Sequence, residues 1–190
     1  MKRKVLSLLL YGVSLAIIGW LAGFQLRYFT SLPDVTEFYQ PAGVNSGVST
    51  ERLEALQDTM LVSGSSFSRG QVSTGSGKAA YVQLLYTDRF YKTLYQPSMK
   101  AGGFWTTDGA VISDRLASQL FLGADCVGAV LTCGPVSYEI TGVYELKEDF
   151  STSAAPLPDV ILPLQQSTVE MVTFSGSQPA SYYLGLVQDA

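Results

Sequence analysis

A predominantly apolar run extends from Val5 to Phe24, directly after a basic cluster at residues 2–4. About twenty helical residues at a 1.5 Å rise span the roughly 30 Å hydrocarbon core of a bilayer. Cationic residues beside such a helix favour the cytoplasmic side. The pattern predicts a single-pass protein of the cell membrane. Residues 1–28 form its cytoplasmic tail and membrane helix, and residues 29–190 form one extracytoplasmic domain.

A cleaved signal peptide is the alternative interpretation of this run. The apolar part of a signal peptide is about 7 to 15 residues long and precedes a site of the A-x-A type. The run here is longer, and residues 19–24 (GWLAGF) offer no pair of small residues at the required spacing. An uncleaved membrane anchor is therefore favoured.

Beyond the run, apolar spacing predicts an α+β domain with a mixed sheet and two or three short helices. Helical spacing after a capping serine, threonine or aspartate predicts helices over residues 50–61, after residue 88 and from residue 114. Gly123 is expected to end the third helix in a left-handed conformation. Residues 30–48 are expected to form a loop or a short strand. The expected strands span residues 66–73, 79–86, 110–112, 127–132, 136–144, 160–162 and 181–188.

The charge distribution narrows the choice of partners. All sixteen acidic residues follow residue 33, so the predicted outer domain is negatively charged. Nucleic-acid binding selects clustered lysine and arginine, which this domain lacks. We therefore expect no nucleic-acid partner.

The sequence contains no histidine, and its two cysteines are Cys126 and Cys133. Serine and cysteine nucleophile systems that use histidine are excluded, as are zinc sites with histidine ligands. An extracytoplasmic disulfide is chemically allowed. However, a strand over residues 127–132 would hold the two Cα atoms about 23 Å apart, whereas a disulfide needs about 7 Å or less. Two free thiols are favoured, and a disulfide would require that strand prediction to be wrong.

The segment Thr74–Lys78 (TGSGK) is similar to part of the phosphate-binding loop G-x-x-x-x-G-K-[ST]. Val72 stands at the first glycine position, and Ala79 stands at the position of the hydroxyl residue. A strand is predicted to follow, so no helix N-terminus would face a phosphate. A glycine- and serine-rich hairpin tip is the favoured interpretation.

Two further groups of residues could bind a ligand. The carboxylates of Glu145, Glu148 and Asp149 could bind Ca²⁺, but their spacing does not match an EF-hand loop, and a solvated acidic loop is favoured. No catalytic, cofactor-binding, metal-binding or ligand-binding residue is assigned. Four tyrosines could line an aromatic groove, although core packing is more typical of such residues: Tyr81, Tyr86, Tyr91 and Tyr95.

Residues 109–144 resemble the MacB-type periplasmic core domain of FtsX-like ABC transporter permeases. The shared pattern is a strand ending in Ile-Ser, a helix with Leu-Ala and Leu-Phe, a Gly-x-Asp-x-x-Gly stretch and a hairpin ending in Gly-Val. The matching residues are Val111, Ile112, Ser113, Leu116, Ala117, Leu120, Phe121, Gly123, Asp125, Gly128, Tyr138, Ile140, Gly142 and Val143.

The resemblance implies a non-catalytic domain that transmits ATPase-driven motion or contacts a substrate or partner outside the membrane. It implies a lipid bilayer around Val5–Phe24, a multi-span permease subunit and a cytoplasmic ABC ATPase as partners, and an envelope protein, peptide or lipid as substrate. The alternative is a standalone membrane-anchored binding or sensing module without an ATPase. An extracytoplasmic hydrolase would need a perturbed nucleophile or acid pair, and none is evident.

The sequence departs from the family pattern at three points. Val127 stands beside Cys126 where the family usually has a proline before the hydrophobic residue, and Gly102–Phe104 replace the usual Gly-Arg. Family permeases continue into three more membrane spans, which are not found here. We expect a shortened member, one part of a split permease, or a fragment.

Overall fold

A computed structural model describes residues 13–15, 17–19, 35–39, 47–105, 107–122, 125–146, 158–176 and 178–188. Residues 13–15 and 17–19 are helical, and the rest of the expected membrane segment Val5–Phe24 lies outside the described residues. Within the described ranges, no helix is both long and apolar enough to cross a membrane. The chain from Val35 onward forms one compact unit.

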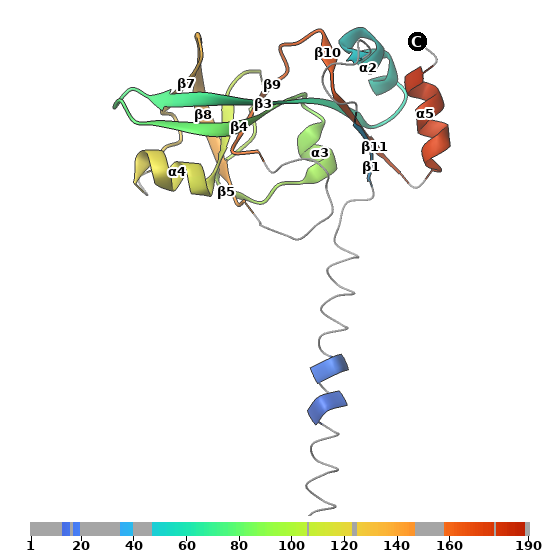
Figure 1. Cartoon of the computed structure of the whole chain (residues 1–190), viewed down its shortest axis with the longest axis horizontal. Coiled ribbons are helices and arrows are strands. Elements are labelled where there is room, and N and C mark those ends of the chain that lie inside the picture. Colours follow the sequence, from blue (N-terminus) through green and yellow to red (C-terminus); the bar gives the residue numbers. More distant parts are fainter. Residues whose placement is uncertain are drawn as a thin grey trace, which may run out of the picture. The chain divides into compact units, whose positions relative to one another are not determined.

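A mixed sheet of nine strands is the centre of this unit (Figure 1). Its strands run in the order β1-β11-β3-β4-β9-β6-β8-β5, and β7 pairs with both β3 and β8. A separate two-stranded sheet pairs β2 (Val48–Ser49) with β10 (Thr168–Val169). The strands of the large sheet are β1 (Val35–Tyr39), β3 (Val62–Thr74), β4 (Ala79–Thr87), β5 (Met99–Gly102), β6 (Ala110–Ser113), β7 (Val130–Cys133), β8 (Val136–Tyr144), β9 (Val160–Pro163) and β11 (Met171–Ser175).

The double pairing of β7 closes part of the sheet into a ring. Strands β3, β4, β9, β6, β8 and β7 follow one another through hydrogen-bonded pairs and return to β3. Alternate residues of a strand point to one face, so each strand presents a set of apolar side chains to the inside of the ring. The resulting cluster contains, among others, Val72, Val82, Ile112, Ile140 and Val160, all buried.

Four helices are described in this unit: α2 (Thr50–Gln57), α3 (Tyr91–Tyr95), α4 (Asp114–Phe121) and α5 (Ala180–Gln188). The expected serine caps are confirmed. The Ser49 hydroxyl accepts from the Arg52 N–H at 3.2 Å, and the Ser113 hydroxyl accepts from the Leu116 N–H at 3.1 Å. Each cap supplies an acceptor for an N–H that has no partner within the helix.

The predicted strand over residues 181–188 is wrong, because this segment forms helix α5. Tyr183, Leu186 and Val187 lie three and four residues apart, which places them on one side of a helix. They pack against the cluster around Phe174, so burial on that side decides the conformation. The count of two or three short helices was accordingly too low for the part of the chain described.

Several boundaries also differ from the predictions. Helix α2 ends at Gln57 rather than at residue 61, β3 begins at Val62 rather than at residue 66, and β7 begins at Val130 rather than at residue 127. Leu122 takes the left-handed conformation (φ 56°) after α4, and Gly123 lies outside the described residues. Strands β5, β10 and β11 were not predicted.

Candidate functional site

The first strand and the last described helix of the unit meet on one aromatic side chain, Phe174 of β11. Its ring is fully buried. The ring of Phe38 on β1 contacts it edge-on, with centroids 5.9 Å apart, and the ring of Tyr183 on α5 stacks on it at 4.7 Å. Figure 1 shows β1, β11 and α5 gathered at the same end of the unit. We call Phe38, Phe174 and Tyr183 the aromatic joint.

Strand β1 is held at this joint by a ladder and by side chains. It pairs antiparallel with β11 from Val35 opposite Ser175 to Tyr39 opposite Met171. On α3, the Tyr95 hydroxyl donates to the Glu37 carboxylate and lies 2.9 Å from the Thr173 hydroxyl oxygen. Burial raises the pKa of Tyr95, and the hydrogen bond to Glu37 raises it further, so the phenol stays a protonated donor.

Helix α5 is tied to its neighbours by polar contacts as well as by stacking. The Arg52 guanidinium of α2 donates to the Leu186 carbonyl at 3.2 Å, and the Tyr183 hydroxyl donates to the Ser175 carbonyl at 3.4 Å. Ser175 is also the β11 residue that pairs with Val35. The first strand and the last helix therefore share β11 as a common support.

Removing one hydroxyl should weaken this attachment measurably. Replacing Tyr95 by phenylalanine leaves the partly buried Glu37 carboxylate without this donor, and we expect the free energy of unfolding to fall by about 1–2 kcal/mol. Urea unfolding of the full chain in detergent micelles measures the change. The matched control is Tyr81→Phe, because Tyr81 is 75% exposed, and it should change stability by less than about 0.5 kcal/mol. Equal effects of the two substitutions would contradict the assignment.

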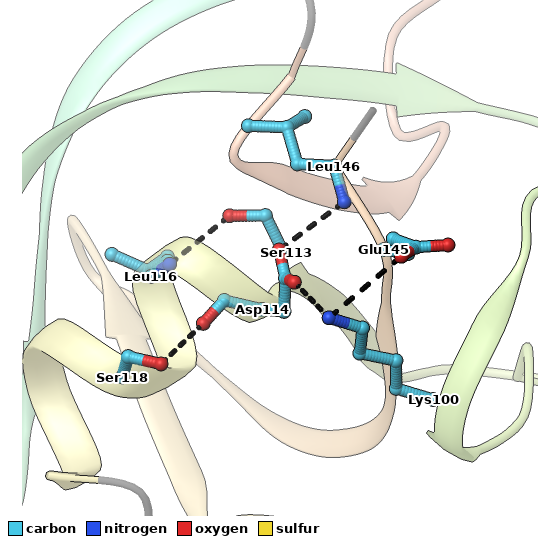
Figure 2. Close-up of polar contacts among 7 residues, drawn as sticks. All are labelled: Lys100, Ser113, Asp114, Leu116, Ser118, Glu145 and Leu146. Carbon is cyan, nitrogen blue, oxygen red and sulfur yellow. Dashed lines mark hydrogen bonds and ion pairs between the residues drawn. The ribbon is translucent and has the colours of Figure 1, made fainter. Parts of the chain in front are cut away.

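A second polar network fixes the start of α4 (Figure 2). The Lys100 ammonium of β5 forms an ion pair with Asp114 and lies 4.0 Å from the Glu145 carboxylate. The Leu146 N–H donates to Asp114 Oδ1 at 3.2 Å. The hydrogen bond from Lys100 is the main cause of the lowered pKa of Asp114. The Ser118 hydroxyl donates to the Asp114 carbonyl, so Asp114 joins three segments of the chain.

This network bears on the acidic residues considered as Ca²⁺ ligands. Glu145 has a lysine ammonium nearby, which already supplies a compensating positive charge. Glu148 and Asp149 lie outside the described residues. In the part of the chain that the structure describes, no three histidine, cysteine, aspartate or glutamate side chains gather in a way that could hold a metal ion.

A groove of about 1020 Å³ lies between α2, the end of β4 and residues 163–166. Asp88 in its wall accepts hydrogen bonds from the Gly64 N–H (2.8 Å), the Phe90 N–H (2.8 Å), the Ser63 hydroxyl (2.9 Å) and the Gln57 amide (2.8 Å). Burial raises the pKa of Asp88, although these hydrogen bonds partly offset the effect. With four donors bound, the carboxylate joins β3, α2 and α3, and its role is structural.

The similarity to a phosphate-binding loop is explained by a hairpin. The Thr74 N–H donates to the Lys78 carbonyl at 2.9 Å, and the Gly77 N–H donates to the Thr74 carbonyl at 2.9 Å. Gly77 has a φ of 81°, a conformation that glycine adopts without strain. Strand β4 follows directly, so the hairpin interpretation is confirmed.

The four tyrosines considered as an aromatic groove lie in different surroundings. Tyr91 and Tyr95 are half-buried and stack on each other at 4.5 Å, whereas Tyr81 is exposed and Tyr86 lines a separate hollow. They do not form one aromatic groove.

Both cysteines are free thiols, and Cys126 is buried while Cys133 is half-buried. Burial raises the pKa of Cys126, which keeps its thiol protonated and weakly nucleophilic.

A comparison with protein families identifies the architecture. Residues 12–187 match the model of the MacB-like periplasmic core domain. This chain belongs to that family. It therefore contains the extracytoplasmic domain of a MacB- or FtsX-like ABC transporter permease family member, and the resemblance carried by residues 109–144 is confirmed.

Solved structures show the same fold as this MacB-like domain. The extracellular domain of the ABC-type transporter YknZ from Gram-positive bacteria is 15% identical, with a TM-score of 0.60 over 79% of this chain and 86% of that one. The periplasmic region of MacB from Actinobacillus actinomycetemcomitans is 12% identical, with a TM-score of 0.63 over 82% and 80%. A domain of a permease protein from Porphyromonas gingivalis is 18% identical, with a TM-score of 0.55 over 77% and 74%. No curated protein matches the chain.

The aromatic joint of this MacB-like domain was missed by sequence reasoning. Phe174 lies in a strand that was not predicted, and Tyr183 lies in the helix predicted as a strand. The available signal was the helical spacing of Tyr183, Leu186 and Val187. The predicted candidates at residues 74–78 and 145–149 do not contribute to the joint.

Proposed function

We propose that this chain is the non-catalytic outer domain of an ABC permease and that it transmits ATPase-driven motion of its membrane segment to partners outside the membrane. The supporting observation is the aromatic joint. Strand β1 is the first strand described after the expected membrane helix in sequence, and it is fixed to β11 by five residue pairs and by the Phe38–Phe174 contact. A displacement of β1 would therefore be carried into the sheet through Phe174.

The ring of strands supports the same role. Strand β11 pairs with β3, and β3 belongs to the closed ring formed with β4, β9, β6, β8 and β7. The ring closes through the pairing of β3 with β7 at Val72–Thr74, and its densely packed interior resists deformation. Displacement of β1 would then rotate the domain as a body rather than shear it.

An affinity purification of the tagged full chain from its native membrane tests this proposal. We expect a multi-span permease subunit and an ABC ATPase to copurify in stoichiometric amounts, because one expected membrane helix cannot bind an ATPase and form a transport path alone. Purification under the same conditions of a version that carries only residues 1–28 before the tag controls for association through the membrane helix. Recovery of the chain without an ATPase would overturn the proposal and favour an anchored binding module.

A further inference from the structure

Strand β3 has an unoccupied stretch on one edge. On that edge it pairs with β11 over Val62–Ser65 and with β7 over Val72–Thr74, while β4 pairs with the opposite edge. On the edge shared by β11 and β7, residues 66–71 pair with no strand among the described residues. This stretch, which we call the β3 gap, lies in the middle of the longest strand of the sheet (Figure 1).

Backbone N–H and C=O groups alternate between the two edges of β3, and this alternation shows which of them face the β3 gap. The Thr74 N–H donates to the Lys78 carbonyl, so the even-numbered residues of β3 bond to β4. In an antiparallel ladder the alternate residues direct both N–H and C=O to the other edge. Phe67, Arg69 and Gln71 therefore present their backbone groups to the gap.

One of these backbone N–H groups already donates to a side chain in place of a neighbouring strand. The Phe67 N–H donates to a carboxylate oxygen of Glu170 at 3.2 Å. The structure gives the backbone groups of Arg69 and Gln71 no partner on this edge within its described residues. Unpaired strand edges bind extended chains by adding a strand.

Space for side chains lies beside the gap. A hollow of about 560 Å³ is lined by small and polar residues of β3 and by the turn after β7, including Ser68, Gly70, Ser73, Tyr86 and Cys133. Ser68 and Gly70 lie on the face of β3 that borders this hollow, and Gln71 and Ser73 of the other face also line it. Arg69 does not line the hollow, and its side chain is exposed. An added strand would direct alternate side chains into the hollow and place the residue opposite Arg69 on the exposed side.

The positive charge of Arg69 decides which kind of polypeptide segment can pair with the β3 gap. If two copies of the chain paired antiparallel about Arg69, two guanidinium groups would lie directly opposite one another, which is unfavourable. We propose that the β3 gap binds an extended segment of another polypeptide, with an acidic side chain opposite Arg69 and small side chains facing the hollow. This site lies apart from the aromatic joint, and the proposal does not depend on the mechanical role of that joint.

Hydrogen exchange of the full chain in nanodiscs tests the proposal with a synthetic probe. The probe is the capped peptide Val-Ser-Asp-Ser-Val at millimolar concentration, which covers Phe67 to Gln71 when its aspartate lies opposite Arg69. We expect the Arg69 and Gln71 amides, which exchange rapidly in the chain alone, to exchange at least tenfold more slowly with the peptide. Peptides in which lysine replaces aspartate, or in which the pairing amides are N-methylated, should protect much less. Unchanged exchange, or equal protection by the N-methylated peptide, would overturn the proposal.

Two variants of the chain test the contribution of backbone pairing and the contribution of charge separately. Arg69→Pro removes an N–H that does not bond to β4, so the fold should persist and protection of Gln71 should be lost. Arg69→Glu keeps the N–H and should reverse the preference, so that the lysine peptide protects better. Arg89→Glu, a substitution at an exposed residue beside the α2 groove, is the charge-matched control and should leave protection unchanged. If Arg69→Pro fails to fold, an unaltered charge preference in Arg69→Glu would still overturn the proposal.

Discussion

Replacement of Phe174 by alanine is expected to lower the free energy of unfolding by about 3–5 kcal/mol, the usual cost of deleting a buried phenylalanine side chain. The ring is fully buried and contacts both Phe38 and Tyr183. Its removal leaves a cavity between β1 and α5 and abolishes both ring contacts. Urea unfolding of the full chain in micelles, followed by fluorescence, measures the loss.

The control for this prediction is Phe174→Leu, which keeps most of the buried volume while it removes the aromatic contacts. We expect a smaller loss of about 1–1.5 kcal/mol, so that the folded state persists. If the chain purifies with an ATPase, this variant should still copurify with it but should couple ATP hydrolysis to motion less well. A loss below about 1 kcal/mol for Phe174→Ala would contradict the aromatic joint as a packed support.

Replacement of Asp88 by alanine is expected to lower the free energy of unfolding by about 3 kcal/mol. The substitution leaves four donors without their acceptor, two of them the backbone N–H groups of Gly64 and Phe90. An unsatisfied buried donor costs about 1–3 kcal/mol, and water in the adjacent groove should satisfy some of the four. The control is Asp58→Ala on the exposed rim of the same groove, which should change stability by less than about 0.5 kcal/mol. Similar losses for both variants would contradict the structural role of Asp88.

The pH dependence of this effect has a definite sign. Because the pKa of folded Asp88 is raised above that of an unfolded aspartate, about 3.9, the folded chain binds the proton more tightly. The contribution of Asp88 to stability is therefore largest below the unfolded pKa and decreases as the pH rises through the folded pKa. The stability difference between the wild type and Asp88→Ala should be larger at pH 4 than at pH 7 in the same urea assay. A smaller difference at pH 4 would contradict the raised pKa.

Local signals in the sequence were sufficient where one residue decides the structure. The hydroxyls of Ser49 and Ser113 cap helices as expected, and Gly134-Pro135 connects β7 and β8 in a hairpin. The alternation of Tyr138 and Ile140 with Glu139 matches their burial. These features depend on hydrogen bonds and turns within a few residues.

The candidate site could not be predicted in the same way, because it depends on contacts between distant segments. Phe38, Phe174 and Tyr183 come from three separate parts of the chain, and no local pattern indicates that they meet. The segment around Tyr183 is apolar enough for either a strand or a helix, and burial against Phe174 selects the helix. The β3 gap likewise depends on where β11 and β7 end along β3.

The start of α4 has a consequence for how this domain can change in evolution. The Leu146 N–H bonds to Asp114, and the Ser113 N–H bonds to the Asp159 carbonyl at 2.8 Å, so both ends of the segment between residues 146 and 159 are attached to adjacent residues. Doubling the length of a loop with fixed ends costs only about 0.6 kcal/mol of closure entropy. Insertions at this position would therefore be almost neutral for folding, and a new binding element could be acquired there without disturbing the ring of strands.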